Sequence, residues 1–208
     1  MWSLIRQARA GGATAVASFV GRYREPVRRF ILRSGLTDAD ADDLSQDVFM
    51  RVFDDGVLDK ADPARGRFRS LILAVTRHVV QHHREREGAQ KRGAGRVMPL
   101  ATDDVVASRE RDADFDREWV ANLIQVALDR LSRENANYFN ALKLFLFEHK
   151  THKEVAAAMR KTEDEVRNYI SRGRARLVEG IHAEIRAYSS SSEEFADEVR
   201  YLSAFLQK

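Results

Sequence analysis

Hydrophobic residues recur at helical spacing along most of the chain. The first stripe follows the order i, i+3, i+4, i+7 and consists of Val16, Phe19, Val20, Tyr23, Val27, Phe30 and Ile31. Pro26 falls within this stripe and is expected either to kink the helix or to open a second one. Gly35 is expected to end it, and Asp38 to cap the next helix. Because no segment shows the two-residue alternation of a β-strand, the pattern predicts an all-α fold.

Two groups of predicted helices are separated by a stretch in which apolar residues become sparse. Glycines and Pro99 interrupt the pattern between residues 88 and 114, which we interpret as a flexible linker, basic in its first half and acidic in its second. The prediction is therefore two helical domains joined by a linker, the second containing a helix-turn-helix. The boundaries are 1–87 for the first domain, 88–114 for the linker, 115–182 for the second domain and 183–208 for a C-terminal extension with a short amphipathic helix.

Composition narrows the class of protein without changing this fold. The chain has 208 residues, 44% of them hydrophobic and 32% charged, and its net charge is only +3. It has no cysteine, which excludes disulfides, Cys-ligated zinc and thiol catalysis. No apolar run approaches the roughly 20 residues of a membrane span, and the N-terminus lacks the apolar core of a signal peptide. We therefore expect a cytoplasmic protein that is not inserted in a membrane.

Charge is segregated along the chain more than the net value suggests. Between residues 38 and 47 five aspartates occur without any Lys or Arg, and Leu44 and Val48 supply the apolar side of the same helix. Such a helix presents its carboxylates to solvent and suits a basic protein partner. Two strongly basic helices follow it, which suit nucleic acid. The combination predicts an adaptor that brings a protein assembly to DNA.

The first basic surface spans residues 77–92, at the end of a helix predicted from Phe68 to about Arg86. It contains Arg77, Arg84, Arg86, Lys91 and Arg92, with His78, His82 and His83 among them. One interpretation is a helix that follows a DNA backbone. A metal site is a second interpretation, since His78 and His82 lie one helical turn apart and Glu85 offers a third ligand, although the HExxH arrangement is absent. The third interpretation is that these residues form a solvated helix end without a binding function.

Residues 151–177 have the layout of a helix-turn-helix. Thr151 with Glu154, and Thr162 with Glu165, each have the spacing of a capping box. The second helix carries the residues expected on DNA, which are Arg167, Asn168, Tyr169, Ser171, Arg172, Arg174 and Arg176. The alternative is a plain solvated basic helix.

The turn between these helices departs from the usual motif. It has Arg160 where a glycine is usual, so an altered turn geometry is expected.

Three segments resemble extracytoplasmic-function sigma factors, the small two-domain initiation factors of bacteria. The stretch from Asp40 to Asp47, followed by Phe49 and Arg51, is similar to their clamp-binding helix. Residues 63–69 are similar to the loop and helix start that follow, and residues 131–177 to the second conserved domain. The resemblance covers about 14–92 and 116–180, and the order and separation of the motifs make it specific.

The resemblance implies that core RNA polymerase and promoter DNA are the partners, and that the protein has neither a catalytic site nor a cofactor. The residues implied in binding the clamp helices of the polymerase largest subunit are Asp40, Asp42, Asp43, Gln46 and Asp47. A loop at 59–67, with Arg69, His78 and His82, is implied in reading a flipped-out base of the minus-ten single strand. Residues 167–172 are implied in reading the minus-thirty-five duplex. The family commonly has Asn at His78 and often Asp at His82, so its promoter preference does not transfer.

The basic stretch 84–96 and the closing residues 198–206 resemble a subgroup with a short C-terminal extension. Such subgroups are often associated with serine/threonine kinases, so a kinase or an anti-sigma factor is a further candidate partner. The final helix is expected to pack on the second domain or on the first domain in a closed, inactive state. Two other functions remain as alternatives: a helix-turn-helix regulator that acts without polymerase, and a metal-dependent hydrolase that uses His78, His82 and Glu85.

Overall fold

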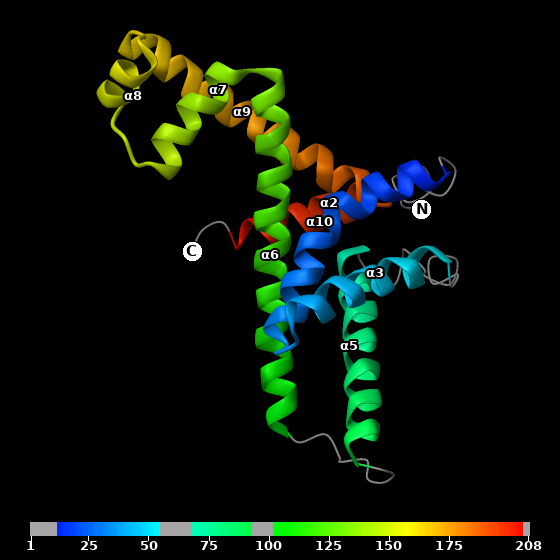
Figure 1. Cartoon of the computed structure of the whole chain (residues 1–208). Helices are drawn as coiled ribbons and strands as arrows, with labels where there is room; N and C mark the ends of the chain where they lie inside the picture. The colour runs from blue at the N-terminus through cyan, green and yellow to red at the C-terminus, as the bar shows by residue number, and fades with distance from the viewer. Residues whose placement is uncertain (1–11, 55–67, 93–101, 206–208) are drawn as a thin grey trace. The chain divides into compact units, whose positions relative to one another are not determined.

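The computed structural model describes residues 12–54, 68–92 and 102–205, and within them every regular element is a helix (Figure 1). The elements are α2 (Gly12–Arg33), α3 (Asp38–Asp54), α5 (Phe68–Arg92), α6 (Thr102–Glu134), α7 (Ala136–Leu142), the π-helix η1 (Lys143–Phe147), α8 (His152–Met159), α9 (Glu163–Tyr188) and α10 (Ser192–Ser203). The predicted all-α class is confirmed. None of the described helices has both the length and the hydropathy of a membrane span.

The chain divides into two compact units, and the first is discontinuous in sequence. It comprises residues 1–122 together with 188–208, whereas the second comprises 123–187. The first unit thus contains α2, α3, α5, the N-terminal part of α6, and α10. The second contains the rest of α6 with α7, η1, α8 and most of α9.

Aromatic side chains form the centre of the first unit. Tyr23 of α2 stacks on Trp119 of α6, with ring centroids 5.2 Å apart and an interplanar angle of 11°. Phe68 of α5 and Tyr188 contact the same indole edge-on, at 6.3 and 5.8 Å. All four rings are buried, and each such pair contributes about 0.5–1.5 kcal/mol beyond the burial of its area. The stripe predicted for residues 16–31 supplies this core, and Tyr188 joins the C-terminal part of the chain to it.

The helix ends of the first unit follow from local hydrogen bonds. Pro26 lies within α2, so it does not open a second helix. Gly35, at φ 83°, ends the helix as predicted, and its amide donates to the Leu32 carbonyl at 2.9 Å. The N-cap of α3 is Thr37 rather than the predicted Asp38, because the Thr37 side chain accepts from the Asp40 amide at 3.2 Å.

The second unit has its own core, made from one face of each helix. The buried residues are Leu131, Ala141, Leu142, Val155, Ala156, Val166 and Ile170. Gly173 lets α9 approach α7, since a Cβ there would lie 3.1 Å from the Leu142 side chain and 3.3 Å from the Tyr138 carbonyl oxygen. Gly180 does the same toward α6, where a Cβ would lie 3.1 Å from that of Ala127. Small residues therefore set the spacing of α9 within this unit.

The predicted linker at 88–114 needs correction, because helix occupies both of its ends. α5 continues through Gly88, which a helix interior tolerates at a cost of about 1 kcal/mol relative to Ala. α6 begins inside the segment, and its acidic residues pair with arginines of the first unit, as Asp114 does with Arg33 at 3.7 Å. Apolar periodicity does not reveal a helix held by such polar pairs. Residues 93–101 lie outside the described part of the chain.

Candidate functional site

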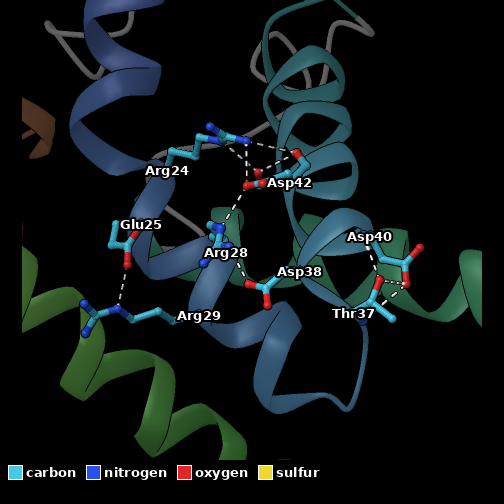
Figure 2. A network of polar contacts seen from close by, with 9 residues as sticks. Arg24, Glu25, Arg28, Arg29, Thr37, Asp38, Asp40 and Asp42 are labelled. Carbon is cyan, nitrogen blue, oxygen red and sulfur yellow. Dashed lines mark hydrogen bonds and ion pairs between the residues drawn. The ribbon is translucent and has the colours of Figure 1, made fainter.

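The aspartates of α3 differ in what they contact. Arg28 of α2 donates to Asp38 at 2.6 Å and to Asp42 at 2.8 Å, and Arg24 donates to Asp42 at 3.0 Å (Figure 2). The hydrogen bond from Arg28 lowers the pKa of Asp42 below its usual value. Asp42, whose side chain is 49% exposed, is therefore shared between the packing of α3 on α2 and any outside partner.

Asp40 is engaged at the start of its own helix. Thr37 donates to its carboxylate from both the hydroxyl, at 2.5 Å, and the amide, at 3.2 Å (Figure 2). The Thr37 hydroxyl is the main reason that the pKa of Asp40 is lowered. This carboxylate completes a capping box and stabilises the first turn of α3.

Asp43, Gln46 and Asp47 remain exposed. Within the described residues no ion pair involves Asp43 or Asp47. The apolar side of the helix is buried as predicted, with Leu44 7% exposed and Val48 fully buried. Of the five predicted polymerase-binding residues, these three are thus the ones that the fold leaves available to a partner.

An apolar groove of about 730 Å³ lies beside these residues, between α2 and α3 of the first unit. It is lined by Val16, Ala17, Val20, Gly21, Arg24, Gln46, Phe49, Met50 and Phe53. Met50 is 52% exposed, which is high for a large apolar side chain. Gln46 belongs both to the groove and to the exposed polar row, so the two features form one continuous surface.

The basic residues of α5 are distributed between buried and exposed positions. Arg69 is only 4% exposed, is paired with Asp116 of α6, and donates to Glu198 of α10 at 2.9 Å. It is therefore not part of an exposed cationic surface in this conformation. Arg77 is paired with Asp112 of α6, and both side chains are partly exposed.

The exposed residues of α5 lie farther along the helix. His78, His82, Arg84 and Arg86 are exposed, and Arg84 donates to the Ser34 carbonyl. The side chains of Lys91 and Arg92, and the whole 59–67 loop, lie outside the described residues. Whether these groups meet DNA stays a prediction.

A metal site receives no support from the described side chains. Nowhere among them are three His, Cys, Asp or Glu residues grouped to hold a metal ion. The rings of His78 and His82 lie 6.5 Å apart, measured between centroids.

In the second unit both predicted capping boxes are present. Thr151 and Glu154 exchange hydrogen bonds at the start of α8, with the Thr151 amide 2.8 Å from the carboxylate. Thr162 and Glu165 do so at the start of α9, where the corresponding distance is 2.9 Å. These backbone hydrogen bonds are the largest cause of the lowered pKa of each glutamate. Both helices, α8 and α9, thus begin where the sequence places them.

The turn between α8 and α9 keeps a left-handed residue without glycine. Arg160 has φ 53° and ψ 50°, the conformation that favours glycine, and its amide bonds back to the last turn of α8. The expected change of geometry is therefore not seen, and Arg160 adopts the strained conformation instead.

The predicted DNA-facing residues of α9 are on its surface, with Tyr169 half-buried against Tyr138. Arg167 pairs with Asp164 at 3.1 Å and Glu163 at 3.5 Å. Arg174 lies over the Phe145 ring at 5.3 Å, and Arg176 pairs with Glu179. Asn168, Ser171 and Arg172 are exposed as well. Among the described residues, no ion pair to Arg172 is found, in contrast to Arg167 and Arg176.

The comparison with protein families gives a match within the first unit. Residues 19–90 match the family model described as Sigma-70 region 2. This segment is therefore similar to a sigma-70 region 2 domain. The match takes in α3 with its aspartates and nearly all of α5, and it supports a sigma-70 family sigma factor that acts in polymerase-directed transcription initiation. A comparison with curated proteins found no match.

Sequence reasoning missed the partners that hold the region 2 domain's charges in place. Arg24 and Arg28 are one helical turn apart on α2, a spacing that could have indicated a basic face for the aspartates of α3. No comparable signal existed for Glu198, which is fully buried. It stands in a short acidic helix whose other carboxylates are exposed or half-buried.

Proposed function

We propose that this chain is an extracytoplasmic-function sigma factor with a C-terminal extension. It binds core RNA polymerase, recognises a two-part promoter and helps to melt it, acting by binding alone. The observation that carries the proposal is the region 2 match over residues 19–90, which includes the exposed Asp43 and Asp47.

The polymerase surface is assigned to the exposed side of α3 and the adjoining groove. Asp43 and Asp47 supply uncompensated negative charge, and Met50 and Phe49 supply an apolar centre. A helical partner with basic and apolar side chains fits this combination, since interfaces commonly join an apolar centre to a charged rim. Asp42 contributes less, because two arginines of α2 already hold it.

The promoter surfaces are assigned to both units. The exposed His78, His82 and Arg86 of α5, together with the loop before it, would meet the minus-ten single strand. The N-terminal half of α9 would meet the minus-thirty-five duplex in its major groove. Support for the second assignment is the pair of capped helices joined by a short turn, with Arg172 exposed.

The test is a charge reversal that leaves the fold intact. Asp43→Lys, Asp47→Lys and the double variant are titrated with core polymerase, and Glu85→Lys, on an exposed position of α5, serves as the matched control. The introduced lysines would repel the basic clamp helices of the polymerase at a cost of several kcal/mol. The double variant should therefore bind at least about 100-fold more weakly. Circular dichroism should be unchanged, because both aspartates point away from the core.

Undiminished binding of the double variant would show that α3 is not the polymerase surface. A regulator that acts without polymerase would give a different pattern. Its wild-type chain would bind specific duplex DNA alone and would not assemble with core polymerase at all.

A further inference from the structure

The last described helix, α10, is anchored to the first unit largely through a buried charge. Glu198 is fully buried and Leu202 is 3% exposed, whereas Phe195 and Val199 are only half-buried. A helix of 12 residues is marginal by itself in water, so α10 depends on this docking to stay helical. The buried carboxylate of Glu198 therefore determines where α10 docks on the first unit.

That carboxylate and a neighbouring ring enclose one arginine. Glu198 accepts from Arg69 Nε at 2.9 Å, and the Tyr201 ring lies over the guanidinium at 4.8 Å from its centroid. The Tyr201 hydroxyl donates to Asp116 at 2.5 Å, and Asp116 itself pairs with Arg69. Tyr188, just before α10, donates to Glu198 at 3.3 Å. Two side chains of α10, one turn apart, thus hold Arg69 by an anion and by an aromatic face.

An anion and an aromatic face are also what a nucleotide offers to arginine. A phosphate oxygen accepts the same charge-assisted hydrogen bond as a carboxylate oxygen. A base stacks on a guanidinium as a tyrosine ring does, which is how proteins commonly capture single strands. The chemistry of the Glu198–Tyr201 pair is therefore that of one nucleotide of single-stranded nucleic acid.

The position of Arg69 connects this chemical similarity to the proposed function. Arg69 is the second residue of α5 and follows the segment 59–67, which the proposed function assigns to the melted strand. We infer that α10 is an internal competitor of single-stranded DNA, with Glu198 in the place of a phosphate and Tyr201 in the place of a base. The inference rests on the proposed function for the identity of the strand.

The rest of α10 strengthens the competition. Glu194 and Asp197 lie on the same helix as Glu198, so the docked helix carries further negative charge. Phosphates approaching Arg69 are repelled until α10 leaves. Arg77 repeats part of this arrangement through its pairing with Asp112 of α6. Two arginines of α5 are thus paired with the chain's own carboxylates, Arg69 with one from α10 and Arg77 with one from α6.

The experiment measures binding of a short single-stranded oligonucleotide of random sequence to the full chain by fluorescence anisotropy. Glu198→Gln removes the competing charge at nearly constant volume. If the undocked form is about a tenth of the population, affinity should rise up to about tenfold. Glu193→Gln is the matched control, because it removes the same charge from an exposed position of α10, and should change affinity less than about twofold.

Two further variants and one measurement on the wild-type chain keep the result interpretable. Tyr201→Ala removes the ring from a side chain that is 39% exposed, so it should raise affinity even if Glu198→Gln unfolds the first unit. Arg69→Gln added to either variant should cancel the gain. Amide exchange of residues 192–203 should speed up when the oligonucleotide is added to the wild-type chain.

Unchanged affinity in both single variants, or exchange in α10 that ignores the oligonucleotide, would show that α10 is a fixed structural element and would overturn the inference. Assembly with core polymerase is measured in parallel on the wild-type chain. Failure to assemble there counts against the sigma-factor function, whereas the competition for Arg69 is judged from the anisotropy alone.

Discussion

At the scale of single residues, the clearest energetic statements concern the capping boxes of the second unit. Hydrogen bonds from Thr162 lower the pKa of Glu165. A lowered carboxyl pKa means that the stabilisation is fully present above the unfolded glutamate value of about 4.3. It is lost as the pH falls through the lower folded value. The ionised Glu165 side chain therefore stabilises the start of α9 at neutral pH, and this stabilisation is lost in acid.

We expect Glu165→Gln to lower the melting temperature at pH 7 and to lose that effect as the pH drops below about 4. Glu163→Gln, in the same first turn but outside the box, is the control. Thermal melts followed by circular dichroism at a series of pH values check this. A melting difference that stays constant down to the acid end would contradict the assigned role of the charge.

Arg172 and Arg167 should differ as DNA ligands, because they differ in their neighbours. Arg167 must leave two acids before it contacts DNA, whereas Arg172 has no such cost. They are five positions apart, roughly 140° around the helix, so they do not face one base pair together. Arg172→Ala should cost about 1–3 kcal/mol and relax one promoter position, and Arg167→Ala should cost less. Binding to a series of mutated upstream elements measures both, and equal, sequence-independent losses would exclude base reading by either.

At the scale of elements, the spacing of helices around α9 depends on glycine. A methyl group at Gly173 would press on the Leu142 side chain, which is fully buried, and on the Tyr138 carbonyl oxygen, which belongs to the backbone. Gly173→Ala should therefore destabilise the second unit by about 1–3 kcal/mol, despite the better helix propensity of alanine. Gly21→Ala in α2 is the matched control, since nothing lies within 4 Å of its added Cβ. It should stabilise the chain by up to about 1 kcal/mol. Urea unfolding of both variants decides the matter, and stabilisation by both would refute the close approach.

Whether the sequence could predict an element depends on the kind of interaction that stabilises it. The stripe from Phe19 to Ile31 is apolar and periodic, so the helix and its buried face were predictable, as were the capping boxes, which are local. The start of α6 is held by ion pairs such as Arg33–Asp114, and no apolar period marks it. The burial of Arg69 was equally hidden, because its partners Asp116 and Glu198 are far away in sequence and only the fold unites them.

At the scale of the whole molecule, the first unit is completed by residues from the far end of the chain. Truncation after Ser190 keeps the buried Tyr188 but removes α10. The loss of Leu202 burial alone should lower the unfolding free energy of this unit by about 1.5–3 kcal/mol, while the second unit is unaffected. Trp119 is fully buried in the first unit. With Trp2 replaced by Phe in both the full and the truncated chain, Trp119 is the remaining tryptophan. The fluorescence of Trp119 then reports unfolding of the first unit. Identical fluorescence melts of the full and truncated chains would contradict the docking of α10.

The discontinuity of the first unit also has a consequence during synthesis. A chain growing at about 5–20 residues per second has made residues 19–90 on the order of ten seconds before it makes α10. For most of that interval, once Asp116 has been made, Arg69 has Asp116 available but not Glu198. The nascent protein therefore passes through a stage in which the surface later covered by α10 is open, and this surface closes only after α10 has been made. Synthesis on the ribosome therefore produces the open form of this surface first and the form covered by α10 second.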